Sequence, residues 1–232
     1  KTKIRNKGGI GPLGDEELVR LVIQGDRQAF AQLVERYQGP IYNLAGQMVG
    51  FGDDARDLTQ EIFLQVYRNL SSFRGEARFA TWIYRVASNK AIDWLRKHRH
   101  QSLSIKDKLT RGFGFMSRQE QLLNLTPEEI YLKKEEAERV RFLLDSLPEK
   151  YRLVLVLHYY HGFSYERIAE TLTIPVRTVE TRLYRARVML KERIKQENNP
   201  EKGGVGIEMP ASAKTTAQLP RRGSRWLFQT RN

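Results

Sequence analysis

Hydrophobic side chains recur every three or four positions through the first hundred residues, which is the spacing of one buried helix face. The first such segment follows Asp15 and carries Leu18, Leu21 and Val22. Asp15 is predicted to cap this helix, and Gly25 is predicted to interrupt it. The amino-terminal pattern therefore predicts helices rather than strands.

The next helix is predicted to begin after the cap Asp26. Its apolar positions are Phe30, Leu33, Val34 and Tyr37. Gly39-Pro40 should break it, because a proline inside a helix removes a hydrogen bond and clashes with the preceding turn. A separate helix is then expected from Ile41 to about Val49.

Two longer helices complete this half of the chain. Asp53, which follows Gly52, is a predicted cap for a helix over about 54–69. The predicted buried stripe of this helix is Ala55, Leu58, Ile62 and Val66. A turn over 71–75 follows, and a long helix is expected from about Arg78 to His98.

Residues 101–125 lose this periodicity and are rich in Ser, Lys and Gln, which predicts a linker. Helical order resumes at Thr126-Pro127, with Glu129 completing a capping box. Pro148 is predicted to start another helix and Gly162 to stop it. The stretch "LVLVLHYY" between them could be a buried strand by periodicity alone, but its length and flanking residues favour a helix.

The sequence therefore predicts an all-α protein, with two small helical domains joined by a flexible linker. The predicted boundaries are 15–100 for the first domain, 101–125 for the linker, 126–196 for the second domain and 197–232 for a disordered basic tail. The second domain carries a helix-turn-helix.

This helix-turn-helix is the stretch "SYERIAETLTIPVRTVETRLYRAR", residues 164–187. Ser164 is a predicted cap for the first helix, and Pro175 fixes φ where the second begins. The apolar stripe of the second helix is Val179, Leu183, Ala186 and Leu190. Its opposite face carries Arg177, Thr178, Glu180, Thr181, Tyr184, Arg185 and Val188. Such a face suits the major groove of DNA, although the solvated face of a helix in a bundle has a similar composition.

Two surfaces of the first domain also carry candidate chemistry. One is a polar face with a single apolar side chain, formed by Asp57, Gln60, Glu61 and Leu64. It is either ordinary surface or a docking site for a basic helix. The other is a strip within roughly 60° on the long helix, formed by Trp82, Arg85, Asn89, Asp93 and Arg96. This strip suits single-stranded DNA, since rings stack on bases and Arg binds phosphate, but it is also consistent with a Trp that covers the core edge beside ordinary surface charges.

Composition narrows the classes of function. Lys and Arg number 40 against 27 Asp and Glu, and the net charge of +13 favours a polyanionic partner such as nucleic acid. The absence of Cys excludes disulfides and thiolate metal sites. The His spacing fits no metal site, the carboxylates lie on caps and exposed faces, and no run reaches the roughly 20 apolar residues of a membrane span. We expect a cytoplasmic protein with no stable membrane insertion, no enzymatic activity, no metal and no cofactor.

Two long stretches then identify a family by resemblance. "DLTQEIFLQVYRNLSSFRGEARFATWIYRVASNKAIDWLR" and "LPEKYRLVLVLHYYHGFSYERIAETLTIPVRTVETRLYRARVMLK" resemble the extracytoplasmic-function (group IV) sigma factors of bacterial RNA polymerase, and the resemblance covers about residues 15–195. It implies that the first domain is sigma region 2, which docks on polymerase and recognises and melts the −10 element. The second domain would be region 4, which reads the −35 element. The implied partners are core RNA polymerase, promoter DNA and an anti-sigma factor.

The resemblance also implies a role for individual positions. The coiled coil of the largest polymerase subunit would be bound by Asp57, Gln60, Glu61 and Leu64. The helix from Pro148 would contact the polymerase flap, with apolar surface around Leu155 and Tyr159. The implied −10 contacts are Phe73, Arg74, Phe79, Trp82, Arg85, Asn89 and Arg96, and the loop 73–79 would capture a flipped base. The implied −35 contacts are Arg177, Thr178, Glu180, Thr181, Tyr184 and Arg185.

Three positions depart from the family pattern. Thr173 and Arg177 stand where Gly is common, and Glu180 stands where a basic residue is frequent. A carboxylate at this last position would accept from cytosine N4 rather than hold phosphate, so the expected −35 sequence changes. The competing hypothesis is a helix-turn-helix regulator that binds duplex DNA without joining polymerase. Such a regulator would need neither the 57–64 face nor the strip on the long helix.

Overall fold

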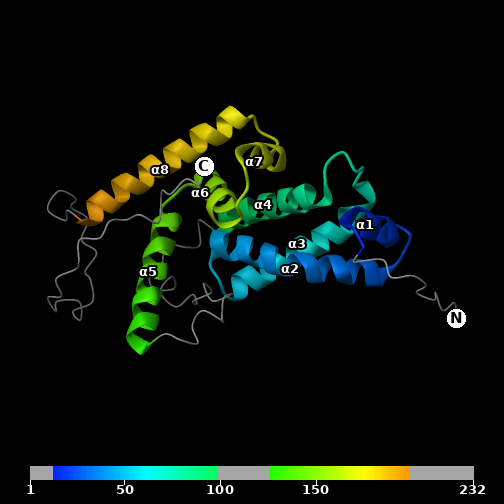
Figure 1. Ribbon diagram of the computed structural model, residues 1–232, viewed down its shortest axis with the longest axis horizontal. Helices are drawn as coiled ribbons and strands as arrows, with labels where there is room; N and C mark the ends of the chain where they lie inside the picture. Colours follow the sequence, from blue (N-terminus) through cyan, green and yellow to red (C-terminus); the bar gives the residue numbers. More distant parts are fainter. Residues whose placement is uncertain (1–12, 99–125, 199–232) are drawn as a thin grey trace. The chain divides into compact units, whose positions relative to one another are not determined.

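The computed structural model describes residues 13–98 and 126–198, and every regular element in these two ranges is a helix (Figure 1). The first range contains α1 (Asp15–Ile23), α2 (Arg27–Val49), α3 (Asp53–Asn69), the short 3-10 helix η1 (Leu70–Ser72) and α4 (Phe79–His98). The second contains α5 (Pro127–Asp145), α6 (Glu149–Leu155), the π-helix η4 (Val156–Tyr160), α7 (Tyr165–Leu172) and α8 (Val176–Asn198). The all-α prediction is confirmed. The predicted linker and the tail beyond residue 198 lie outside the described residues.

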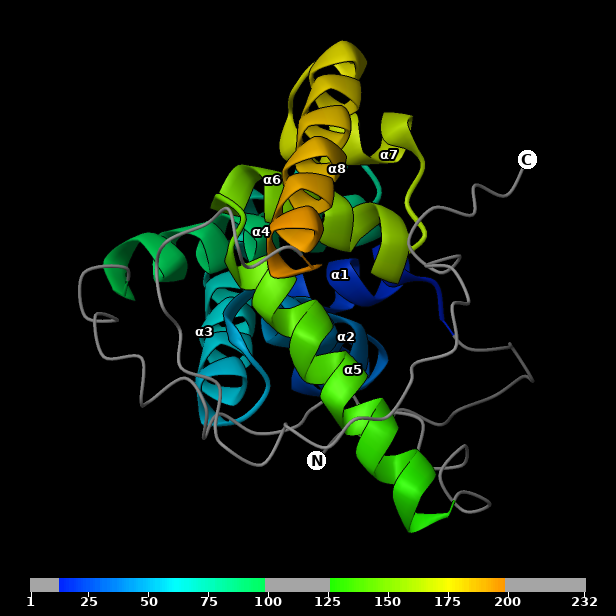
Figure 2. The ribbon, with the colours of Figure 1, turned by 90° about the vertical axis from the view of Figure 1, so that its left-hand side faces the viewer.

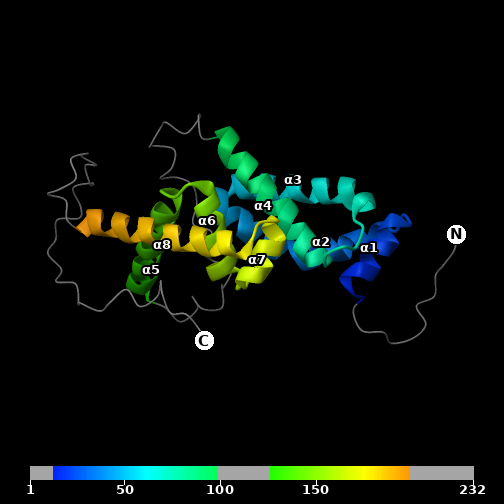
Figure 3. The same ribbon diagram turned by 90° about the horizontal axis from the view of Figure 1, so that it is seen from above.

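The helix α2 is central to the first range. It packs against α1, α3 and α4, and Figures 2 and 3 both show α3 running beside it. The largest of its fully buried side chains are Leu33, Ile41, Leu44 and Met48. The stripe expected on α3 is confirmed, because it buries Ala55, Leu58, Ile62 and Val66. Together with Phe79 and Ile83 of α4, these side chains form the core that fixes which faces of α3 and α4 remain outside.

The predicted break at Gly39-Pro40 is wrong, since α2 continues through both residues. A proline inside a helix costs about 3 kcal/mol. The apolar stripe nevertheless continues across it, with Tyr37 before the proline and Ile41 and Leu44 after it, all buried. Burying each such side chain is worth about 1.5–3 kcal/mol, so keeping one continuous helix outweighs the local cost of Pro40.

The three predicted aspartate caps have different outcomes. Asp26 is confirmed, because its carboxylate accepts from the backbone N–H groups of Gln28 and Ala29 at 2.8 and 3.3 Å. Asp15 and Asp53 are not caps, since each is the first residue of its helix and a glycine occupies the cap position. Asp15 instead accepts from the side chains of Arg36 and Tyr37 on α2.

The second range has its own apolar face. The stripe predicted on α8 is confirmed, with at most 5% exposure at Val179, Leu183, Ala186 and Leu190. Ser164 caps α7 as predicted, accepting from the Arg167 N–H at 3.2 Å. The segment after Pro148 is helical as predicted, but it changes from α6 to the π-helix η4. The expectation of apolar surface around Leu155 is wrong, because this side chain is buried, whereas Tyr159 is partly exposed.

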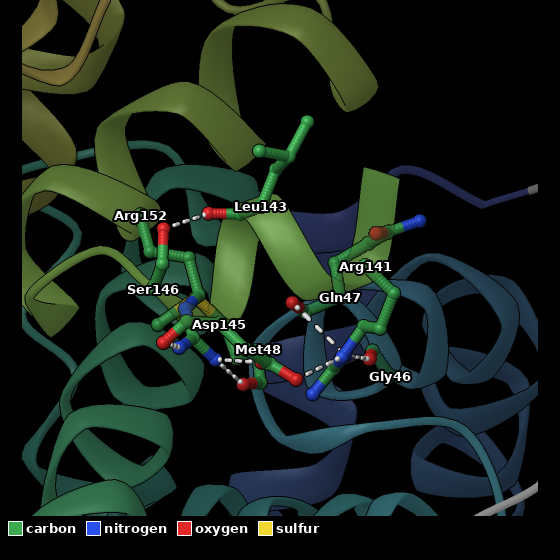
Figure 4. Close-up of polar contacts among 8 residues, drawn as sticks. All are labelled: Gly46, Gln47, Met48, Arg141, Leu143, Asp145, Ser146 and Arg152. Carbon is green, nitrogen blue, oxygen red and sulfur yellow. Dashed lines mark hydrogen bonds and ion pairs between the residues drawn. The ribbon is translucent and has the colours of Figure 1, made fainter. Parts of the chain in front are cut away.

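The C-terminal end of α2 is held by two arginines from α5 and α6 (Figure 4). The last carbonyls of a helix have no partner within it. Arg141 donates to the Gln47 carbonyl at 3.4 Å and Arg152 to the Met48 carbonyl at 2.6 Å. Arg141 also donates at 2.6 Å to the Gly46 carbonyl, which accepts from the Gly50 N–H as well. Positive charge is also favourable here, because the C-terminal end of a helix carries partial negative charge. These bonds join helices that are almost a hundred residues apart in the sequence.

Asp145 completes this network. Its carboxylate lies 2.8 Å from Arg152 and 3.0 Å from Arg141, so one carboxylate balances two guanidinium groups. The side chain of Arg152 is only 6% exposed. Burial lowers the pKa of Arg152 to about 10, partly offset by Asp145, and the group remains charged at neutral pH. A buried charge of this kind is stable only while its partners stay in place.

Removing one member of this network should destabilise the fold. Arg152→Ala is expected to lower the free energy of unfolding by about 3 kcal/mol or more, because it removes the donor of the Met48 carbonyl and leaves the partly buried Asp145 carboxylate with Arg141 alone. The matched control is Arg56→Ala, which breaks an ion pair with Asp53 whose side chains are 71% and 90% exposed. It should cost less than about 0.5 kcal/mol. Urea denaturation followed by circular dichroism measures both, and equal losses would contradict the structural role of Arg152.

Candidate nucleic-acid and partner interfaces

The polar face of α3 lies outside the core, as its spacing predicts. Asp57, Gln60, Glu61 and Leu64 are all exposed, and Leu64 keeps 48% of its surface exposed. They share one face because residues three and four apart are neighbours on a helix. Glu61 also lies 3.7 Å from Lys90 of α4. The result is an apolar side chain surrounded by two carboxylates and an amide, which is a suitable surface for a basic partner.

Three aromatic rings form a cluster where the loop 73–78 meets α4. The Phe73 and Trp82 rings lie 5.4 Å apart, and Phe79 lies 5.9 and 5.8 Å from them. Phe79 has no exposed surface and packs edge-on against Tyr37 of α2. It therefore supports the cluster from the core, and in this conformation it offers no surface for a direct contact to DNA. Phe73 and Trp82 are half-buried, and Arg74 beside them is exposed.

The strip expected along α4 is only partly open. Asn89 and Arg96 are exposed. Arg85 is half-buried and its guanidinium is already occupied: Nη2 donates to the Glu170 carbonyl at 2.8 Å, and Nε donates to the Thr171 carbonyl at 3.1 Å. Both carbonyls belong to the last turn of α7. No sequence pattern predicts this contact, because it joins residues more than eighty positions apart.

The outer face of α8 has the composition and exposure that its spacing predicts. The exposed members are Arg177, Glu180, Thr181, Tyr184 and Arg185, whereas Thr178 is half-buried. The Tyr184 side chain is 68% exposed. A hydrogen bond from Arg185, together with the nearby Lys150, lowers the pKa of the Tyr151 hydroxyl. Arg187 is directed elsewhere and donates to the hydroxyls of Tyr159 and Tyr165 at 3.0 and 3.4 Å.

The turn between α7 and α8 explains why glycine would be favoured at position 173. Thr173 has φ of 54°, in the left-handed region that side chains with a Cβ adopt reluctantly. The N–H of Ile174 donates to the Ala169 carbonyl at 3.0 Å, which closes the end of α7. The chain therefore accepts some backbone strain at Thr173 in order to start α8 at Val176.

A cluster around His161 was missed by sequence reasoning. Its Nδ1 lies 3.1 Å from the Tyr84 hydroxyl of α4, and the Tyr84 ring packs against Phe163 at 4.8 Å. Arg167 lies over the other ring, 3.7 Å from the Phe163 centroid. Burial, and to a lesser extent the charge of Arg167, lowers the pKa of His161 to about 4. Sequence reasoning considered His161 only as a metal ligand, and its spacing does not reveal a partner on a distant helix.

Within residues 13–98 and 126–198, none of the helices combines the length and the hydropathy that crossing a lipid bilayer requires.

The chain is similar to two families and to several characterised proteins. Sigma-70 region 2 matches residues 33–101, and sigma-70 region 4 matches residues 137–190. The ECF RNA polymerase sigma factor SigW of Bacillus subtilis is 36% identical over 180 residues, covering 76% of this chain and 95% of that protein. The ECF RNA polymerase sigma-E factor of Haemophilus influenzae is 38% identical over 187 residues, covering 78% and 96%.

Solved structures give a consistent result. CnrH, solved in complex with the cytosolic domain of CnrY, matches with a TM-score of 0.56 and 26% identity, covering 79% of this chain and 98% of that one. The sigma factor RpoE of Bartonella quintana, solved with the anti-sigma factor NepR, has a TM-score of 0.51 over 72% of this chain and 96% of that one. At 21% identity, this second match shows a shared fold only.

The low pKa of His161 should make stability depend on pH. The unfolded chain takes up a proton on this ring near pH 6.5, whereas the folded protein keeps the ring neutral down to about pH 4. Between these values the unfolded state binds more protons, so the free energy of unfolding should fall by up to about 3 kcal/mol as pH is lowered from 6.5 to 4. The contribution is fully present above pH 6.5.

The matched variant is His161→Gln, which has no titrating ring. Urea denaturation over this pH range should give a shallower slope for the variant than for the parent, and the difference between them isolates His161 from the carboxylates. The ionisable groups that face the ring are the Tyr84 hydroxyl, whose own pKa is raised by burial, and the Arg167 guanidinium, whose charge lowers the pKa of the ring. Identical slopes would contradict the burial of the neutral ring.

Proposed function

Because the chain belongs to the ECF family of RNA polymerase sigma factors, we propose that its separate exposed faces divide the steps of promoter recognition. The α3 face docks on core polymerase, the surface around Phe73 and Asn89 receives the −10 element, and α8 reads the −35 element. The observation that carries the proposal is the α3 face, where two carboxylates, an amide and the exposed Leu64 lie together on a helix whose other side is in the core.

The α3 face has the chemistry of a protein interface. An exposed leucine can act as an apolar anchor, and the surrounding Asp57 and Glu61 attract and orient a basic partner. The coiled coil of the largest polymerase subunit is the proposed partner. The partly exposed Tyr159 and Tyr160 of η4 are the proposed contacts to the polymerase flap, in place of the buried Leu155.

The −10 surface combines stacking with reading. Phe73 and Trp82 present half-buried rings on which unpaired bases stack, and the buried Phe79 holds them in place. Asn89 presents an amide that can contact a base edge, and Arg74 and Arg96 supply positive charge for phosphates. The boundaries proposed for the region that carries these groups remain 15–100, with 126–196 for the region that carries α8.

The −35 surface is the exposed side of α8. Glu180 and Thr181 lie in its first two turns, where a recognition helix approaches base edges. Arg185 follows one turn later on the same exposed face and holds the DNA backbone. The Thr181 hydroxyl donates to the Arg177 carbonyl at 2.8 Å, so its oxygen can still accept from a base.

The competing hypothesis was a helix-turn-helix regulator that binds duplex DNA without joining polymerase. Membership of the sigma factor family decides against it, since the similarity to SigW extends over 95% of that protein. We propose no catalytic role for the chain, because RNA synthesis belongs to core polymerase. We also propose that the protein acts in the cytoplasm. CnrH was solved with a domain of CnrY and RpoE with the anti-sigma factor NepR, which supports proposing an anti-sigma partner here.

The docking proposal is tested by reversing charge on the α3 face. Asp57→Arg with Glu61→Arg should reduce binding to core polymerase at least a hundredfold, because two like charges then oppose a basic partner. Fluorescence anisotropy of the labelled protein against core polymerase measures this. The matched control is Glu35→Arg with Glu138→Arg, which reverses two exposed carboxylates on α2 and α5. Full binding by the docking variant, with native circular dichroism, would refute the assignment.

The −35 proposal separates a reading residue from a gripping residue on α8. Glu180→Ala should relax selectivity at a single base pair, by about 1–3 kcal/mol. Arg185→Ala should weaken binding to all duplexes about equally. It should also reduce the slope of log binding constant against log salt concentration by about 1. Holoenzyme binding to a library of −35 variants at several salt concentrations measures both. Sequence-independent losses from both substitutions would mean that Glu180 does not read bases.

A further inference from the structure

We propose that Glu16 of α1 is a positioning residue for the −10 surface, because its carboxylate holds the first turn of α4 and with it Phe79. This inference rests on the proposed role of the Phe73 and Trp82 rings in receiving the −10 element. α1 packs beside both η1 and α4. The Phe79 N–H, at the first residue of α4, donates to Glu16 Oε1 at 3.5 Å. α1 thus takes part in promoter recognition without touching DNA.

The start of α4 depends on a carboxylate from another helix. The first N–H groups of a helix have no partners within it, and a short polar side chain just before the helix usually supplies an acceptor. Here the two preceding residues are Ala77 and Arg78, whose side chains contain no acceptor. Glu16, 63 positions before Phe79, supplies one instead. Since 3.5 Å is long for a hydrogen bond, much of the attraction is between this negative charge and the partial positive charge of the helix end.

The neighbouring carboxylate of α1 supports Phe79 through its ring. Asp15 accepts from the Tyr37 hydroxyl and from Arg36 on α2. Burial, together with the hydrogen bond to Asp15, raises the pKa of Tyr37, so the hydroxyl remains a donor. The Tyr37 ring lies edge-on to the Phe79 ring, 5.5 Å away. Two successive residues of α1 therefore reach Phe79, one through its backbone and one through its side chain.

α1 is itself fixed to the core, which makes this support firm. Leu18 and Val19 are buried, whereas the Glu16 side chain is exposed. Replacing Glu16 therefore removes a charge at the surface and leaves the core side chains in place. The position is suitable for a test by substitution because the variant should still fold.

A displacement of Phe79 reaches the −10 surface through ring contacts. Its ring lies 5.9 Å from Phe73 and 5.8 Å from Trp82. Asn89 lies ten residues beyond Phe79, or about 15 Å along the helix, and is much less affected. Loss of Glu16 should therefore disturb the stacking rings and spare the amide that reads base edges.

The first measurement is local and needs no DNA. Trp94→Phe and Trp226→Phe leave Trp82 as the single tryptophan of the full chain, which contains three. Losing a cap shifts a helix end toward its frayed state about fivefold. In this background, Glu16→Ala should therefore raise the acrylamide quenching constant of Trp82 fluorescence while circular dichroism stays native. Glu16→Gln keeps an acceptor but loses the charge, so its quenching constant should lie between those of the parent and Glu16→Ala.

The matched control is Glu17→Ala, the same change at the next position of α1. Glu17 forms an ion pair with Arg20 of its own helix. Its removal should leave the quenching of Trp82 unaltered. Unchanged quenching in Glu16→Ala, or an equal rise in Glu17→Ala, would overturn the proposal.

The second measurement is holoenzyme binding to a library of −10 variants, with the −35 variants as an internal reference. A flipped base is selected by the shape of the pocket that receives it. Glu16→Ala should therefore reduce the preference at a single −10 position, by up to about fivefold, and leave every −35 preference unchanged. Increased quenching with all −10 preferences retained would show a cap that supports α4 alone, and would refute the positioning role.

The two measurements separate this inference from the proposed function. If the parent holoenzyme showed no preference at any −10 position, the proposed −10 surface would fail while the quenching result stood. If the parent showed such a preference and Glu16→Ala changed neither measurement, the positioning role alone would be refuted.

Discussion

The constraint on which the arrangement depends is the need of α2 for donors at its C-terminal end. This helix is the centre of the first range and ends in carbonyls that have no partners within the helix. Arg141 and Arg152 supply those donors from α5 and α6, and Asp145 balances their charge. Because Arg152 is buried, the contact contributes to the fold only as a complete set. It also places the helix-turn-helix segment where α7 can meet α4.

That placement gives the molecule two kinds of surface. The outer faces of α3 and α8 are exposed because of helical periodicity: when one side of a helix is buried in the core, the residues on its opposite side face solvent. The surface of α4 is different, because it faces α7 as well as solvent, and Arg85 is bound on that side. A surface that serves as an internal contact in one state can serve as a binding site only in another. The two faces on α3 and α8 are free of this conflict.

The sequence predicted most where a residue's environment is set by its neighbours along the chain. The stripe from Ala55 to Val66, the stripe from Val179 to Leu190 and the cap at Ser164 follow from spacing and are confirmed. The family was also evident from the sequence, because its two motifs occur in order. Predictions from one residue alone were less successful. Pro40 does not break α2, since continuous burial outweighs the cost of one proline. Asp53 is the first residue of α3, and Gly52 occupies the cap position predicted for it.

The sequence by itself determined the helices, the exposed faces of α3 and α8, and the family. Local periodicity and local capping suffice for these, because each depends on residues only a few positions apart. Only the tertiary structure decided that Phe79 lies in the core beneath Phe73 and Trp82, that Arg85 binds the end of α7, and that His161 is neutral against Tyr84. These outcomes depend on side chains from distant segments, whose meeting is fixed by which helices share a core. No spacing within one helix carries that information.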